Sequence, residues 1–246
     1  MEHGPIYRIL PGSENAVLLI HGICGSPAHF AGLLPLIPPD WSVYNILLDG
    51  HSGTVGEFGR SSMEKWKTQV ENLLEKLFRE HSRVFLVGHS MGTLFAIRAA
   101  VGNAERVPGL FLLAVPLRPH LPLSTMLTCL RVAWGNLRPD DAAAWAMRND
   151  TGIQLTRRLW QYIPWAPRMV ELLAECSRVR RLLPRLQVKT LAFQARGDEL
   201  VSIRTVDDLH KNPWIHTTVL EESGHFAYGS GDTRLLEEAF RDFLTW

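Results

Sequence analysis

The chain has 246 residues, of which 46% are hydrophobic and 21% are charged, and its formal net charge is +1. This composition indicates a folded protein with a large core, and the near-neutral charge excludes a nucleic-acid-binding protein that relies on a basic surface. Three cysteines without disulfide or zinc spacing, no signal-peptide pattern in residues 1–10 and no apolar run near the roughly 20 residues of a membrane span predict a cytoplasmic protein.

Short apolar runs alternate with helical patterns along most of the chain. In chain order they predict a strand at Ala16–Ile20, a helix from Ser26-Pro27 to about Leu36, a strand at Val43–Leu48, a helix over Met63–Leu77, a strand at Val84–Val87, a helix at Leu94–Ala100, strands at Gly109–Ala114, Thr190–Ala195 and Thr217–Leu220, and a closing helix over Leu235–Phe243. Continuous apolar runs are typical of strands that are buried on both faces. Strands alternating with helices predict an α/β fold, with a mainly parallel sheet and helices on both of its faces.

Residues 116–186 interrupt this alternation. They hold seven of the fifteen prolines and four of the eight tryptophans, and no buried strand is evident. Their eleven arginines and five acidic residues give a charge of +6, which leaves −5 for the rest of the chain. We therefore expect a core formed by residues 1–115 and 188–246, with a helical cap inserted at 116–187. The basic cap either docks on the acidic core or forms a pocket for an anionic substrate.

The segment Gly88-His89-Ser90-Met91-Gly92 fits the pattern G-x-S-x-G between a predicted strand and a predicted helix. A sharp strand-to-helix turn holds the serine in a strained backbone conformation that exposes its hydroxyl, and the flanking small residues leave room for the turn. The start of the helix also favours negative charge that develops there. The pattern in this context predicts Ser90 as a nucleophile.

A serine hydroxyl needs a base, and His225 is the best placed of the ten histidines. It follows the last predicted strand in the sequence SGHF, at the carboxyl edge of the sheet, where sites of parallel α/β proteins form. His21, His51 and His89 lie in neighbouring motifs, and we expect them to shape loops.

The base needs a carboxylate, and Asp198 follows the strand that ends at Ala195, in the sequence RGDELV. Neighbouring side chains of an extended segment point in opposite directions, so Glu199 is expected to face away from the base. Asp207 and Asp208 lie farther along, in a predicted helix. We therefore predict Asp198 as the orienting acid.

The oxyanion of an acyl-transfer reaction needs two backbone N–H donors. The N–H of Met91, directly after the nucleophile, is one candidate. The loop after the first strong strand supplies the other, and we choose Ile23. Cys24 lies beside it, and a thiol nucleophile at that position is a minor alternative.

The chain order Ser90, Asp198, His225 is that of the α/β-hydrolases. The segment LLIHGICGSPAHF resembles the HG-x-x-G-[ST]-P segment of bacterial carboxylesterases and monoacylglycerol lipases, and DGHSGTVGEF resembles the P-G-H-G segment of that family, with Ser52 in place of a glycine. GHSMG, RGDELV and SGHF resemble its nucleophile elbow, acid loop and histidine loop. The resemblance spans roughly residues 16–115 and 188–246, and the cap does not resemble that of the family.

The resemblance implies acylation of Ser90, loss of the alcohol, and hydrolysis of the acyl-enzyme by water that His225 activates, with no metal or organic cofactor. It implies small-molecule ester substrates with short or medium acyl chains, including monoacylglycerol-like esters. Four cap tryptophans are candidates for lining the acyl pocket: Trp134, Trp145, Trp160 and Trp165.

Other activities use the same fold. A thioesterase would use the same machinery, and the aromatic cap favours an esterase for hydroxycinnamoyl esters. Haloalkane dehalogenases and epoxide hydrolases place an aspartate where Ser90 stands, which disfavours both. A non-catalytic binding protein that retains these residues is the alternative outside the enzymes.

Overall fold

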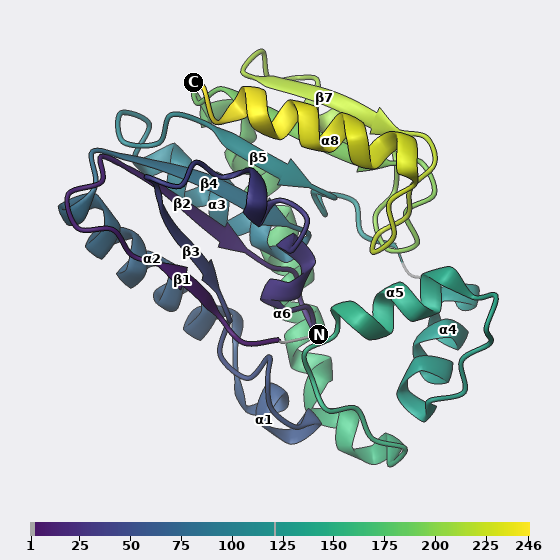
Figure 1. Cartoon of the computed structure of the whole chain (residues 1–246). Helices are drawn as coiled ribbons and strands as arrows, with labels where there is room; N and C mark the ends of the chain where they lie inside the picture. The colour runs from purple at the N-terminus through teal and green to yellow at the C-terminus, as the bar shows by residue number, and fades with distance from the viewer. Residues whose placement is uncertain (1–2, 121) are drawn as a thin grey trace.

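A seven-stranded sheet forms the centre of the protein in the computed structural model, which describes residues 3–120 and 122–246 (Figure 1). Its strands are β1 (Ile6–Arg8), β2 (Asn15–Ile20), β3 (Ser42–Ile46), β4 (Arg83–His89), β5 (Leu110–Leu113), β6 (Thr190–Ala195) and β7 (Ile215–Leu220). Their order across the sheet is β1-β3-β2-β4-β5-β6-β7, and every pair is parallel except β1 with β3. The predicted α/β fold is confirmed.

Both faces of the sheet are covered by helices, which explains the continuous apolar runs of its strands. Leu18 and Leu86 belong to the core cluster on one face, with residues of α2 (Met63–Glu80), α3 (Met91–Gly102) and α6 (Ala166–Leu182). Leu19, which follows Leu18 in β2, and Phe85, which precedes Leu86 in β4, belong to the cluster on the other face. Residues of α8 (Ser230–Phe243) belong to the same cluster. In Figure 1, α8 lies across that face.

The segment expected to form one helix from Ser26-Pro27 to Leu36 forms two short 3₁₀ turns instead, η1 (Pro27–Phe30) and η2 (Leu34–Leu36). The physical reason is Pro35, which has no N–H to donate to an earlier turn. The N–H of Leu36 donates to the carbonyl of Leu33 at 3.0 Å, three residues back, in the 3₁₀ pattern. The prediction of an α-helix here is therefore wrong.

Two elements outside the insertion were not predicted: β1 and α1 (Val55–Arg60). The predicted helix that contains Asp207 and Asp208 is α7 (Thr205–Leu209). A capping box starts α1: the Thr54 hydroxyl accepts from the N–H of Glu57 at 3.3 Å, and the Glu57 carboxylate accepts from the N–H of Thr54 at 2.6 Å. The helix is short, so its apolar pattern is too brief to be recognised from sequence.

The segment 116–187, hereafter the insertion, contains α4 (Leu123–Trp134), α5 (Ala142–Asp150), η3 (Leu159–Trp165), α6 and η4 (Leu183–Arg185). α6 packs against α2 and α3 in the main core. α4 and α5 pack on each other beside the sheet, around a small cluster of Val132, Ala144 and Met147 (Figure 1). No helix in the described ranges has both the length and the apolar character that crossing a membrane requires.

Candidate active site

Ser90 occupies the sharp turn between β4 and α3. Its φ of 49° and ψ of −121° lie in a region that non-glycine residues rarely adopt, which is the strained conformation expected of a nucleophile elbow. The N–H of Ser90 donates to the carbonyl of Leu113 at 2.9 Å, and its carbonyl accepts from the N–H and the hydroxyl of Thr93 at 3.0 and 2.7 Å. These backbone bonds hold the strained residue in place.

The two glycines of the motif allow the turn to pack closely. A Cβ atom at Gly92 would overlap the carbonyl oxygen of Ile20 in β2, and one at Gly88 would lie 2.7 Å from the nitrogen of Thr93. Larger residues at either position would push α3 away from the sheet. The two glycines thus leave room for the turn, as the sequence pattern predicted.

His225 and Asp198 form a buried pair at the carboxyl edge of the sheet. The two oxygens of Asp198 lie 2.9 and 3.0 Å from Nδ1 of His225. One of them, Oδ1, also accepts from the N–H groups of Leu200 and Val201 at 2.8 and 2.7 Å, so the carboxylate is fixed by its own loop. In the described chain, no hydrogen bond joins the Ser90 hydroxyl to His225. The ring of His225 lies beside that of His89, the residue before Ser90, with 4.9 Å between the ring centres.

Glu199 also reaches the histidine loop, although alternation predicted that it would face away. Its Oε2 accepts from the backbone N–H of His225 at 2.7 Å. The segment after β6 is a turn, so the alternation of an extended strand does not apply. A Cβ atom at Gly224 would lie 2.7 Å from Oε1 of Glu199, so the glycine makes room for this carboxylate.

The electrostatic surroundings of His225 favour its protonated form. Burial lowers the pKa of His225, but the carboxylate of Asp198, with smaller contributions from Glu199 and Asp150, raises it above the ordinary value for histidine. The Nδ1–H group of His225 donates a hydrogen bond to Asp198, which leaves Nε2 unprotonated in the neutral ring and able to act as a base.

Three other buried histidines stay neutral, and one of them, His89, lies beside His225. Burial lowers the pKa of His21 to about 4 and holds the pKa values of His51 and His89 well below the ordinary range. His21 accepts from the N–H of Leu48 at 3.0 Å and donates to the carbonyl of Gly22 at 2.8 Å, so it fixes the conformation of its loop.

Nε2 of His89 donates to the carbonyl of His225 at 3.1 Å. His89 also stacks on His29, with 3.6 Å between the ring centres. Nδ1 of His29 donates to Asp150 of α5 at 2.9 Å, and its Nε2 lies 3.3 Å from the hydroxyl of Tyr228. Potential metal-binding atoms of His29, His89 and Asp150 lie within 4.8 Å of one another. Both nitrogens of His29 are engaged in hydrogen bonds, whereas Nδ1 of His89 is buried and has no hydrogen-bond partner in the described chain.

The loop that carries Ile23 lies directly against the elbow. A Cβ atom at Gly22 would lie 2.9 Å from the Cβ of Ser90, so this glycine permits the close approach. Met91 is the first residue of α3, and its N–H therefore has no acceptor within the helix. Burial raises the pKa of the Cys24 thiol well above its usual value, which disfavours a thiolate nucleophile there.

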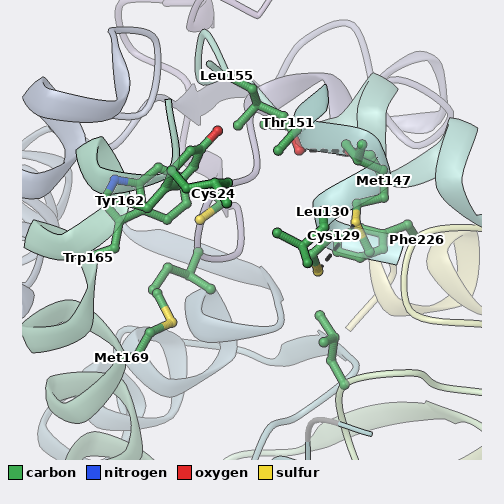
Figure 2. Close-up of a pocket in the computed structure, with 15 residues that line it drawn as sticks. Cys24, Cys129, Leu130, Met147, Thr151, Leu155, Tyr162, Trp165, Met169 and Phe226 are labelled. Carbon is green, nitrogen blue, oxygen red and sulfur yellow. Dashed lines mark hydrogen bonds between the residues drawn. The ribbon is translucent and has the colours of Figure 1, made fainter. Parts of the chain in front are cut away.

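A cavity of about 540 Å³ lies between the insertion and the site (Figure 2). Ile23, Leu200 of the acid loop and Phe226, the residue after His225, line it on the side of the α/β core. Of the four tryptophans, Trp165 lines this cavity, whereas the other three do not. The remaining lining comes from the insertion and from Cys24: Cys129, Leu130, Val132, Ala133, Met147, Thr151, Leu155, Leu159, Tyr162 and Met169.

Comparisons with known proteins agree with this architecture. The model of the family described as serine aminopeptidase, S33, matches residues 12–218. One similar structure is that of a metagenome-derived lipolytic enzyme from a study of LipS and LipT, at 21% identity and a TM-score of 0.73, with 99% of this chain and 97% of that chain covered.

A monoacylglycerol lipase from Paleococcus ferrophilus is 17% identical, with a TM-score of 0.70 and coverage of 99% and 98%. A carboxylesterase from Nitrososphaera gargenis is 16% identical, with a TM-score of 0.69 and coverage of 98% and 95%. No curated protein matches. The family match covers most of the chain, and the protein therefore belongs to the serine aminopeptidase S33 family of α/β-hydrolases.

Proposed function

We propose that the protein is a serine hydrolase that cleaves carboxylic esters through an acyl-enzyme on Ser90. The observation that carries the proposal is the strained Ser90 at the elbow, beside the buried His225–Asp198 pair. Strain of this kind persists only where the surrounding structure maintains it, and it is concentrated at functional sites.

The reaction proceeds in two steps. Nε2 of His225 takes the hydroxyl proton as Oγ of Ser90 attacks the ester carbonyl, and Asp198 stabilises the imidazolium that forms. The N–H groups of Ile23 and Met91 bind the oxyanion. The C–O bond of the ester then breaks, and His225 returns the proton to the leaving alcohol. Water, deprotonated by His225, next attacks the acyl-enzyme and releases the acid and Ser90.

The cavity fits an uncharged hydrocarbon acyl chain. The polar groups of three lining residues bond elsewhere: the Thr151 hydroxyl donates to the carbonyl of Met147 at 2.7 Å, the Tyr162 hydroxyl donates to the carbonyl of Thr156 at 3.1 Å, and Nε1 of Trp165 donates to the carbonyl of Val55 at 2.8 Å. A polar substrate group in this cavity would lose its water without gaining a partner.

The same lining argues against two other activities. An aminopeptidase would need an acidic side chain for the substrate's ammonium group, and the cavity has none among its lining residues. A hydroxycinnamoyl esterase would need a hydrogen-bond partner for the phenol hydroxyl of its substrate, and the polar groups of Thr151, Tyr162 and Trp165 already bond to backbone carbonyls. A thioesterase remains the second candidate, because its acyl group makes the same demands as that of an ester.

A fluorophosphonate probe is expected to label the protein at Ser90, because an activated serine is the residue such probes modify. Peptide mapping by mass spectrometry identifies the labelled residue, and Ser90→Ala should remain unlabelled. Release of alcohol from a chromogenic ester, in a burst followed by turnover, separates an enzyme from a non-catalytic binding protein. A label on another residue would contradict the assignment.

Filling the cavity should shift the preferred acyl length. Leu155→Trp places a large ring in the cavity, and we expect kcat/KM for a long-chain ester to fall about tenfold relative to an acetyl ester. Trp160→Ala is the matched control, because Trp160 is 65% exposed and does not line the cavity. The measurement is kcat/KM across a series of p-nitrophenyl esters. Equal profiles for Leu155→Trp and the wild type would place the acyl pocket elsewhere.

The acid limb of the pH profile should depend on Glu199. Because neutral His225 is the base and its pKa is raised, kcat/KM should fall as the pH drops through a value above the ordinary pKa of histidine. Glu199→Gln retains an oxygen for the N–H of His225 but removes a negative charge, so the acid limb should move to lower pH. The plateau of kcat should fall less than about tenfold.

Glu221→Gln is the control for this shift, because Glu221 is exposed and paired with Arg196. Its acid limb should coincide with that of the wild type. A Glu199→Gln profile that also coincides with the wild type would show that Glu199 has no electrostatic influence on the base.

A further inference from the structure

The insertion carries most of the exposed apolar surface of the protein. Ten of the fifteen large hydrophobic side chains that are exposed in the described chain belong to it, although it forms less than a third of the sequence. They are Leu123, Leu127, Leu130, Trp134, Trp145, Leu159, Trp160, Ile163, Val170 and Leu173. Exposed apolar side chains gathered in this way mark a surface that binds a partner.

Four of these residues form one stripe along α4. Leu123, Leu127, Leu130 and Trp134 are spaced by four, three and four residues, so they project from the same side of the helix. Their exposed fractions run from 39% to 70%. Val132, on the opposite side, is buried in the cluster between α4 and α5. The helix therefore packs through one side and leaves an apolar side uncovered.

A second exposed apolar row lies on η3, formed by Leu159, Trp160 and Ile163. Leu159 and Leu130 are both exposed and both line the cavity, so they lie at its mouth. The stripe on α4 and the row on η3, together the mouth surface, are thus continuous with the cavity. An occupant of this surface would be adjacent to the entrance of the substrate.

Positive charges predominate beside the mouth surface. Arg157 and Arg158, directly before the row on η3, are exposed and form no ion pair in the described chain. Nε of Arg157 donates to the carbonyl of Trp134 at 3.1 Å, which joins the end of α4 to this basic pair. α4 contains no acidic residue, and residues 123–165 hold five arginines against three aspartates, of which Asp141 pairs with Arg131 of α4.

We propose that the mouth surface docks on a lipid surface that carries anionic headgroups. Apolar side chains of α4 and η3 would enter the boundary between headgroups and acyl chains, with the tryptophans at headgroup level and the arginines near the phosphates. A second copy of this chain fits less well, because a symmetric pair would bring the same positive charges together. The cavity then opens toward the phase in which acyl esters dissolve.

Flotation with lipid vesicles tests the proposal independently of any hydrolysis. The vesicles consist of ether-linked phosphatidylcholine, with or without ether-linked phosphatidylglycerol, and contain no ester to cleave. The wild type should float with the vesicles that contain phosphatidylglycerol, and high salt should weaken its binding. Leu123→Ser/Leu127→Ser/Ile163→Ser should bind at least about tenfold more weakly. None of these three residues lines the cavity, so hydrolysis of a water-soluble ester should persist.

Ile6→Ser/Ile9→Ser/Leu235→Ser is the matched control, since it removes three exposed apolar side chains that lie outside the insertion. This variant should bind like the wild type. Arg157→Gln/Arg158→Gln should reduce the preference for phosphatidylglycerol. Wild-type protein that fails to float with either vesicle, or an α4 and η3 variant that floats as well as the control, would overturn the proposal. Light scattering that shows a wild-type dimer, dissociated by that variant, would assign the mouth surface to self-association instead.

Discussion

Replacing Ser90 with alanine should lower kcat for a carboxylic ester by about six orders of magnitude while the protein remains folded. The loss is large because the acyl-enzyme cannot form without the hydroxyl, so the base and the oxyanion donors have no nucleophile to assist. The fold should persist because the Ser90 side chain makes no capping bond at the start of α3. The backbone bonds to Leu113 and Thr93 do not involve the side chain that is removed.

The measurement is steady-state hydrolysis of a p-nitrophenyl ester, with thermal unfolding followed by circular dichroism. Ser52→Ala is the control, because Ser52 is exposed in the loop after β3 and should retain full activity. Folded Ser90→Ala protein with near wild-type turnover would end the proposal of a Ser90 acyl-enzyme.

Replacing Asp198 with asparagine should lower kcat by about four orders of magnitude, as the equivalent change does in a comparable triad. The hydrogen bonds explain why. Oδ1 of Asp198 accepts from the N–H groups of Leu200 and Val201, so an asparagine oxygen would take that position. Its NH₂ group would then face Nδ1 of His225 and favour the tautomer protonated on Nε2, which cannot accept the serine proton.

Asp208→Asn is the matched control for this experiment. Asp208, on α7, pairs with Arg118 and Lys211, and the loss of its charge should cost less than about tenfold in kcat. The two variants are compared on one ester at one pH. If Asp208→Asn or Glu199→Gln proved more damaging than Asp198→Asn, the assignment of the orienting acid would be incorrect.

The sequence predicted the sheet well, because its strands are buried on both faces and read as continuous apolar runs, as in Ala16–Ile20. The elbow was also predictable, since it depends on residues that are neighbours in the chain. β1 was not, because it is an edge strand of three residues that are partly or largely exposed, and so it has no apolar run. Pro35 was overlooked as a helix breaker.

The surroundings of the site could not be predicted, because they depend on contacts between distant parts of the chain. Asp150 reaches His29 across 121 residues of sequence. Trp165 lines the cavity while Trp160, five residues earlier, is exposed, and the sequence treats the two alike. The bond from Glu199 to the N–H of His225 requires a turn that no local pattern specifies.

The buried neutral histidines should also determine how the protein responds to acid. His21, His51 and His89 have pKa values below that of an unfolded histidine, so the unfolded chain binds protons that the folded chain does not. Their stabilising contribution is complete above the unfolded pKa and declines as the pH falls below it, by up to about 1.4 kcal/mol per histidine for each pH unit.

His225 behaves in the opposite sense, because its raised pKa means that the folded state binds its proton first. On gradual acidification, His225, the proposed base, should therefore be protonated reversibly while the fold is intact. Uptake of protons by the other three imidazoles should unfold the protein only at lower pH. Inactivation and denaturation by acid are thus expected to be separate transitions with separate proton acceptors.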